Sequence, residues 1–388
     1  MKRDFSKLFH LSALLLACTF NAHAQTQPQP ADTTKLVEYA VIPAISFNSD
    51  LGLLFGGQGN RYDYSSGQRP YTTFINSTAV ISTRGLFFFE IKYDKPKSFG
   101  GNVRTTFETS IGRFFDDNFF GIGNNEKLTS PPDDNPDLYN FRSFTADYTL
   151  DFRFLLRRYR GNNRLEFITR SNLVYETPFD NPAERQISVD APIGIDGGVS
   201  HVLSAGFVLD RRNDEIRPTR GSFTRLNVGG AAGIIGSSFN YGLIDFENRA
   251  FYPLFGSQNI SIASRVLFRH ATGSDVPYWQ LSALGGQQRL RGFPVRRFLD
   301  NGYLTANTEI RAWLGRFPVL KTETGIVLFS DIGRTFANDQ FDEFFNDYNS
   351  TVGVGLIMSL FTPDFFIRWD VGFSEEEIGV FIGTGFLF

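Results

Sequence analysis

The chain has 388 residues, a formal net charge of −3, 15% aromatic residues and a single cysteine. The weakly acidic balance provides no basic surface for nucleic acid. One cysteine excludes an intrachain disulfide, and its position at residue 18, in a segment with the plan of a signal peptide, leaves no thiolate for a metal site after cleavage. Most of the aromatic residues are phenylalanines, 43 in number, and they are accompanied by 37 glycines. This composition is typical of a membrane β-barrel with aromatic girdles and tight turns, although a soluble β-sandwich also fits it.

The N-terminus has the plan of a secretory signal peptide. A basic segment, an apolar stretch over 8–20 and the small-residue site Ala22-His23-Ala24 follow one another. The apolar stretch is too short to span a bilayer. We therefore predict a signal peptide over 1–24 that is removed on export. A second possible cut precedes Cys18, in a segment that resembles a lipobox and would leave this cysteine lipidated.

Residues 25–36 are expected to form a short polar linker, and the remainder, 37–388, reads as one β-domain. No stretch in it approaches the ~20 apolar residues of a transmembrane helix. About sixteen segments have a length near the ~10 residues that a barrel strand needs. Their predicted ranges are 37–47, 50–62, 69–82, 84–94, 101–114, 138–156, 163–178, 196–210, 221–235, 238–252, 257–270, 301–314, 318–335, 348–360, 363–374 and 377–388.

Apolar and polar residues alternate in several of these segments. Over 144–154, aromatic and aliphatic residues occupy one face and Thr, Asp and Arg the other. In 365–374, Arg368 and Asp370 lie opposite Ile367 and Trp369. Such a period of two places one face against lipid and the other in a wet lumen. Because a soluble sandwich shows the same alternation, this pattern does not decide between them.

The lengths of the connections favour the membrane barrel. Four long connections, 115–137, 179–195, 271–300 and 336–347, follow odd-numbered strands, whereas the even-numbered connections are mostly short. One rim of short periplasmic turns and one rim of long loops is typical of bacterial outer-membrane barrels. We predict an all-β fold, a single antiparallel transmembrane barrel of about sixteen strands in the lipid of the outer membrane.

The chain ends in an alternating segment with an aromatic residue at the C-terminus. Val380, Ile382, Thr384, Phe386 and Phe388 share one face of the predicted last strand. This pattern resembles the C-terminal signal by which outer-membrane barrels are recognised, so the assembly machinery is an expected partner for the chain's own insertion. It also predicts that both phenylalanines face lipid.

The segment 285–293 combines glycines with an arginine and an aromatic residue. Glycine lets a loop fold back at positive φ, and a guanidinium is a bidentate anchor for carboxylates. We therefore predict an extracellular loop that folds inward and is fastened by Arg291, with Gly292 and Phe293 beside it. Glu309 lies on the polar face of the following strand, which directs it into the lumen.

The segment Leu290-Arg291-Gly292-Phe293 resembles the inward-folded loop motif of the BamA/TamA-like outer-membrane superfamily, or bacterial surface antigens. Segments 307–311, 329–333 and 210–221 resemble further motifs of this family, the last being its turn between strands eight and nine. The resemblance implies that the loop arginine pairs with Glu309 and Asp331. It also implies a role in the assembly, insertion or translocation of outer-membrane components.

The family's periplasmic POTRA modules do not fit into 25–36, so we expect periplasmic or lipoprotein partners to supply that part. Family members open laterally between the first and last strands. Pro43 cannot donate a ladder hydrogen bond, and Gly383 and Gly385 weaken the last strand. These residues predict a loosely paired seam, although ordinary irregularity at a sheet edge is the alternative.

Other functions remain possible from the sequence. A passive channel and a structural docking subunit both fit a barrel with long loops. A membrane lipid hydrolase would need a base and a nucleophile, and only His201 and His270 remain after cleavage at Ala24, with no serine motif beside His201. We expect no enzyme activity, no cofactor and no metal site. Arg291 is expected to stiffen the barrel rather than to handle a substrate.

Overall fold

The computed structural model describes residues 36–48, 52–67, 69–124, 136–159, 163–257, 259–317, 322–338, 344–360 and 365–388. The predicted signal peptide, Cys18 and the linker up to residue 35 lie outside these ranges. Sixteen strands form one antiparallel sheet in the order β1 to β11 followed by β14 to β18. The prediction of an all-β chain with a sixteen-stranded antiparallel sheet is confirmed.

Most strand bounds lie within a few residues of the prediction. The strands of the large sheet are β1 (Val37–Asn48), β2 (Gly52–Asp63), β3 (Thr73–Ser82), β4 (Phe87–Ser98), β5 (Val103–Asn118), β6 (Asn140–Arg158), β7 (Arg164–Pro178), β8 (Gly198–Asp210), β9 (Gly221–Ala231), β10 (Tyr241–Pro253), β11 (Ile260–Thr272), β14 (Gly302–Phe317), β15 (Thr322–Phe336), β16 (Asn349–Ser359), β17 (Phe366–Phe373) and β18 (Ile378–Thr384). Two short strands, β12 (Ser282–Leu284) and β13 (Phe298–Asp300), pair with each other in the connection between β11 and β14.

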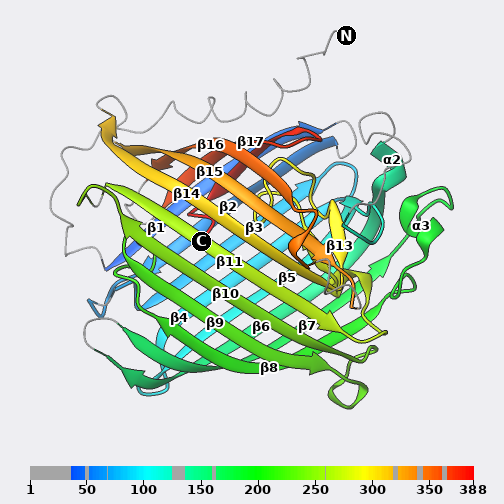
Figure 1. The fold of residues 1–388 in the computed structure, drawn as a ribbon, viewed down its shortest axis with the longest axis horizontal. Helices are drawn as coiled ribbons and strands as arrows, with labels where there is room; N and C mark the ends of the chain where they lie inside the picture. Colours follow the sequence, from blue (N-terminus) through cyan, green and yellow to red (C-terminus); the bar gives the residue numbers. More distant parts are fainter. Residues whose placement is uncertain are drawn as a thin grey trace, which may run out of the picture.

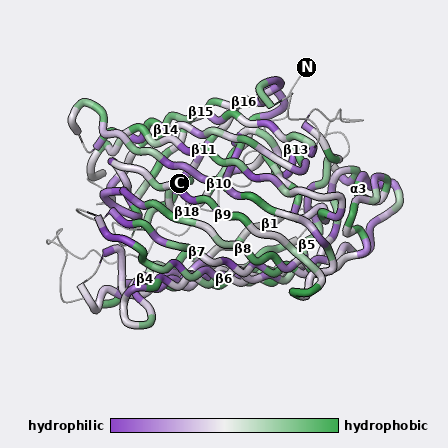
Figure 2. Tube along the Cα trace, turned by 60° about the horizontal axis from the view of Figure 1, so that its bottom comes forward, coloured by the Kyte–Doolittle hydropathy of each residue, from purple (hydrophilic) through white to green (hydrophobic). Residues whose placement is uncertain are grey.

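The two faces of the sheet differ as the alternation predicts. On β9, Leu226 and Val228 are 42% and 52% exposed, whereas Asn227 between them is buried. The colours of Figure 2 alternate in the same way along individual strands. Inward side chains of many strands are charged and paired, as in the ion pair between Arg170 and Asp151. The outer face is therefore apolar, and the inner face is polar.

The long connections gather at one end of the molecule, where α2 (Pro136–Tyr139), α3 (Gln186–Asp190) and β13 lie together (Figure 1). We call this the long-loop end and the opposite one the short-turn end. No helix among the described residues has the length and hydrophobicity needed to cross a membrane.

The sheet curls so that its two edges approach each other. Within the described residues, no backbone pairing joins β1 to β18. Side chains connect the edges instead: Gln58 Nε2 of β2 donates to Thr384 Oγ1 of β18 at 3.4 Å, and Ala40 of β1 lies in one apolar cluster with Ile367 of β17. We call the boundary between β1 and β18 the seam.

The last strand is shorter than predicted. β18 ends at Thr384, and Gly385, at φ 78°, directs residues 386–388 away from the strand. Phe388 is 5% exposed, and its carbonyl accepts a hydrogen bond from Arg311 Nη2 at 3.0 Å. The prediction that Phe386 and Phe388 face lipid was therefore wrong, because arginines of the inner wall bind the tail. Their role as an assembly signal stays a prediction.

The outward face gives a test of membrane placement. Leu226 is the central residue of β9 and points outward. We expect Leu226→Arg to destabilise the protein in lipid vesicles by about 2–4 kcal/mol, because a charge at the bilayer midplane is poorly solvated. Urea unfolding in vesicles measures this effect. Leu226→Ala is the matched control, and equal losses for both variants would contradict the assignment of this face.

Candidate functional site: the Arg291 cluster

Arg291 occupies the centre of a buried ionic cluster on the inner wall. Its Nε and Nη2 donate to the two carboxylate oxygens of Asp331 at 2.8 and 2.7 Å. Its Nη1 donates to Glu309 at 2.8 Å and to Asp370 at 3.3 Å. The side chains of Arg291, Glu309 and Asp331 are fully buried. The structure thus brings together the three charged residues that the sequence assigned to the loop anchor.

The backbone beside Arg291 lies directly on β17. Gly292 has φ 102°, and a Cβ there would contact the backbone of Gly372 and Phe373 at 3.2 Å. Gly372 is restricted in return, because its Cβ would approach the carbonyl carbon of Arg291 to 2.8 Å. Ser374 Oγ donates to the carbonyl of Gly292 at 2.6 Å. Two facing glycines therefore allow the loop to reach the wall.

An apolar contact holds the other side of the loop. Phe293 is 1% exposed and packs edge-to-face on Phe298 of β13, with ring centroids 5.1 Å apart. The same buried cluster includes Leu284 of β12, Leu290 and Tyr303. Phe293 thus fastens the loop to its own small sheet, while Arg291 fastens it to the large one.

The charges of the cluster are balanced by two further arginines. Glu309 also accepts from Arg368 Nη2 at 2.7 Å and from Arg311 Nε at 2.8 Å. Arg368 in turn pairs with Asp370 at 2.6 Å. Three guanidinium groups therefore face three carboxylates. Such balance is required here, since an unpaired buried charge is costly.

Sequence reasoning did not assign Arg311, Arg368, Asp370 or Phe329 to this cluster. Arg368 and Asp370 share the polar face of their strand, which was visible in the alternation, but nothing in the sequence indicated that β17 faces the loop. The ring of Phe329 lies 3.5 Å from the guanidinium carbon of Arg291. Phe329 is two residues from Asp331 on the same strand, so the sequence already placed both side chains on one face. Arg265 anchors the loop from β11 by donating to the carbonyl of Gln288.

The three residues predicted to loosen the seam have different surroundings. A Cβ at Gly383 would meet Gln287 of the loop at 2.6 Å, so this glycine makes room for the loop. Gly385 follows the end of β18, and a Cβ there would meet no described residue other than its chain neighbours within 4 Å. Pro43 is exposed on β1 opposite Gly57. Their effect on lateral opening stays a prediction.

The structure places a serine beside His201, although no serine motif marks it in the sequence. Ser171 Oγ of β7 lies 2.9 Å from His201 Nε2 on β8, and His201 Nδ1 lies 2.6 Å from the carbonyl oxygen of Ile235. The residues are thirty positions apart in the chain, so no local motif marks the pair. These contacts give both ring nitrogens of His201 a partner. Such partners are needed where a polar side chain lies on the outer, apolar face of the sheet.

The fold is similar to solved outer-membrane structures. The Omp85 superfamily domain model matches residues 77–381, whereas no curated protein matches the sequence. BamA from Haemophilus ducreyi lacking POTRA domains 1–3 is similar with a TM-score of 0.56 at 13% identity, over 90% of this chain and 70% of that one. CdiB from Escherichia coli gives 0.57 at 12% identity, over 90% and 61%, so the chain spans less than two thirds of CdiB.

The Arg291 anchor is testable by substitution. Arg291→Ala leaves Glu309 and Asp331 without their shared partner, which we expect to destabilise the folded protein by about 3–5 kcal/mol. Protease access to 273–301 and heat-modified gel mobility measure the loosened loop. Arg289→Ala is the matched control, because Arg289 donates to the carbonyl of Ala283 and to no carboxylate that the described residues show. Unchanged protease access in Arg291→Ala would contradict the anchor.

The Ser171–His201 pair is testable with a fluorophosphonate probe. Ser171 lies within β7, which is paired on both sides, so its neighbouring backbone N–H groups are committed to the ladder and unavailable to an oxyanion. We therefore expect no labelling of the folded protein. Labelling that disappears in Ser171→Ala would instead establish a reactive nucleophile and reopen the lipid-hydrolase alternative.

Proposed function

Since the chain belongs to the Omp85 superfamily, we propose that it is an outer-membrane protein that assists the assembly, insertion or translocation of other outer-membrane components. In this proposal the sheet forms a barrel with the short-turn end in the periplasm and the long-loop end outside. Periplasmic or lipoprotein partners present the client. The loop that carries Arg291 is then an extracellular loop folded into the barrel.

The seam is the observation that supports this role. β1 pairs with β2 along its length and β18 pairs with β17, but the described residues show no ladder between β1 and β18. A ladder hydrogen bond contributes about 0.5–1.5 kcal/mol, so this boundary is the least costly one to separate. An exposed strand edge in lipid needs a new partner, and a client strand supplies one by adding to the edge.

The Arg291 cluster makes the two sides of the seam unequal. Its carboxylates lie on β14, β15 and β17, so the loop braces the C-terminal side of the seam. Gln287 of the same loop lies over Gly383 of β18. We infer that β1 and its neighbours move away from a stiff C-terminal side. Arg291 thereby acts as a brace without contacting the client.

A passive channel is the alternative function, and a structural docking subunit is a further one. The buried loop and the inward tail both occupy the lumen, which opposes steady conduction. A docking subunit requires no movement at the seam. Both alternatives therefore predict that a covalent bridge across the seam is harmless.

Bridging the seam tests the proposal. Gln58→Cys and Thr384→Cys place thiols on two side chains that are in contact, and a short bifunctional thiol reagent joins them. Cys18, the chain's own cysteine, lies in the predicted signal peptide. We expect bridged cells to show the outer-membrane protein profile of the deletion strain, because the seam no longer separates.

The matched control bridges two strands that are already paired. Val371→Cys and Val380→Cys lie opposite each other on β17 and β18, so their bridge should leave function intact. If the seam bridge is as harmless as this control while the deletion strain shows a defect, lateral opening is dispensable. A channel or docking role is then the better account.

A further inference from the structure

The turn between β8 and β9 enters the lumen instead of ending at the rim. We call residues 211–220 the lumen turn. Asn213 N donates to the carbonyl of Arg220 at 3.0 Å, which extends the hairpin beyond the strands. At the tip, Asp214 Oδ1 accepts from the backbone N–H groups of Ile216 and Arg217, each at 2.8 Å. The lumen turn therefore has a defined conformation that presents consecutive side chains to different walls.

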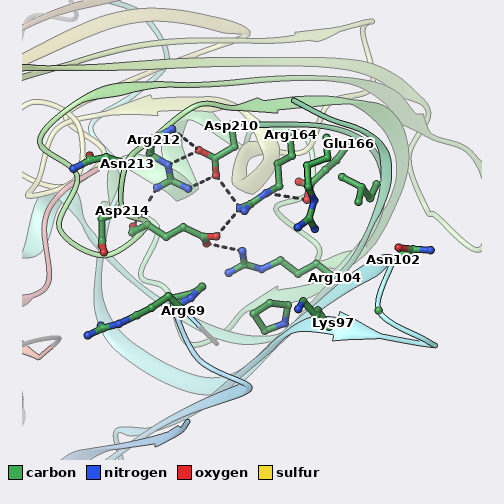
Figure 3. Close-up of a pocket in the computed structure, with 16 residues that line it drawn as sticks. Arg69, Lys97, Asn102, Arg104, Arg164, Glu166, Asp210, Arg212, Asn213 and Asp214 are labelled. Atoms are coloured by element: carbon green, nitrogen blue, oxygen red, sulfur yellow. Dashed lines mark hydrogen bonds and ion pairs between the residues drawn. The ribbon is translucent and has the colours of Figure 1, made fainter. Parts of the chain in front are cut away.

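Glu215 reaches the wall formed by β5 and β7. Its two carboxylate oxygens accept from Arg104 Nη1 and Arg164 Nη2, both at 2.6 Å. Arg212 donates to its backbone carbonyl at 3.2 Å. Arg104, Arg164 and Arg212 line a cavity of about 320 Å³ beside Glu215. Figure 3 shows these three side chains converging there. Burial opposes ionisation of Glu215, but these guanidinium groups outweigh it and hold the pKa of the carboxyl below its usual range.

Arg217 reaches the wall on the other side. Its Nη1 donates to Glu323 Oε2 of β15 at 2.7 Å. Its guanidinium carbon lies 3.9 Å from the ring centroid of Trp313 on β14. In the sheet, β14 and β15 lie on one side of β8 and β9, and β5 and β7 lie on the other. Glu215 and Arg217, which carry opposite charges, therefore tie the lumen turn to two separate walls.

Ile216, between these two, extends to the strands that flank the seam. It packs against the apolar cluster that contains Ala40 of β1, Tyr62 of β2 and Ile367 of β17. These strands lie about half the sheet away from β8 and β9. The lumen turn thus crosses the full width of the lumen.

Three cavities meet at the lumen turn. The first, of about 320 Å³, is lined by Glu215. A second, of about 480 Å³, lies between Ile216 and the loop residues Gln287 and Gln288. A third, of about 440 Å³, is lined by Arg217. The lumen turn is therefore the partition that separates the space beneath the loop from the short-turn end.

We propose that the lumen turn is a plug for the short-turn end of the lumen, latched by the pairs of Glu215 with Arg104 and Arg164 and of Arg217 with Glu323. A solute or polypeptide entering from that end has to displace it. Because its tip contacts strands on both sides of the seam, displacement also removes an internal contact between them. The plug is independent of the client and of whether the seam opens in function.

The lumen turn and the loop held by Arg291 differ in how easily they are displaced from the lumen. The Glu215 and Arg217 side chains are 18% and 24% exposed, whereas that of Arg291 is fully buried. Solvent screens partly exposed pairs and weakens them relative to buried ones. The lumen turn is therefore released more easily than the loop held by Arg291.

A thiol in the middle cavity measures the opening of the plug. Asn76 of β3 lines the cavity between Ile216 and the loop and is 4% exposed. Asn76→Cys in a Cys18→Ser background should react slowly with a membrane-impermeant methanethiosulfonate. We expect Glu215→Gln or Arg217→Gln to accelerate this reaction by about tenfold or more, since about 1.4 kcal/mol in the opening equilibrium gives this factor.

Further variants separate the latch from general loosening. Glu323→Gln breaks the Arg217 latch from the wall and should match Arg217→Gln. Asp151→Asn removes a carboxylate that pairs with Arg170 on the inner face of the sheet, and neither of these residues lines one of the three cavities or belongs to the latch. We expect this control to keep the slow rate. Rates are compared on the folded species, identified by heat-modified gel mobility.

Two results would overturn the plug. One is a slow rate in folded Glu215→Gln, Arg217→Gln and Glu323→Gln proteins while Arg291→Ala accelerates labelling, which would place the only barrier at the long-loop end. The other is equal acceleration by Asp151→Asn, which would show that the loss of an ion pair away from the lumen turn is enough to open the lumen.

Discussion

The ionic contact of Arg291 is the constraint on which the C-terminal half of the molecule depends. A buried guanidinium is tolerable only with full pairing, and its carboxylates come from β14, β15 and β17. One side chain therefore fixes the relative positions of three strands and of the loop that carries it. The glycines at 292 and 372 follow from this contact, because the loop backbone has to lie on the strand backbone.

The molecule combines a braced side with a less constrained one. β14 to β18 are connected through the Arg291 cluster, through Gln287 over Gly383 and through the bound tail. β1 and its neighbours meet this side through side chains such as Gln58 and through the apolar cluster that Ile216 joins. The stiff part of the molecule, β14 to β18, thus lies next to the seam. Any movement at the seam is therefore confined to β1 and its neighbours.

The sequence predicted those features that depend on local periodicity. Alternation located the sixteen strands, and parity directed Glu309 and Asp331 inward. Features that depend on contacts between distant strands on the inner face of the sheet could not be predicted. Arg368 and Asp370 had the correct parity but no visible partner, and the partners of Glu215 lie far from it in the chain. The tail alternates like a strand, yet arginines on distant strands determine its course.

The inward course of the tail has a practical consequence for handling the protein. Phe388 is the last residue and lies against Arg311 and Arg265 on the inner wall. A purification tag or fluorescent fusion attached there would start on the inner face of the sheet, and its first residues would compete with the tail for these arginines.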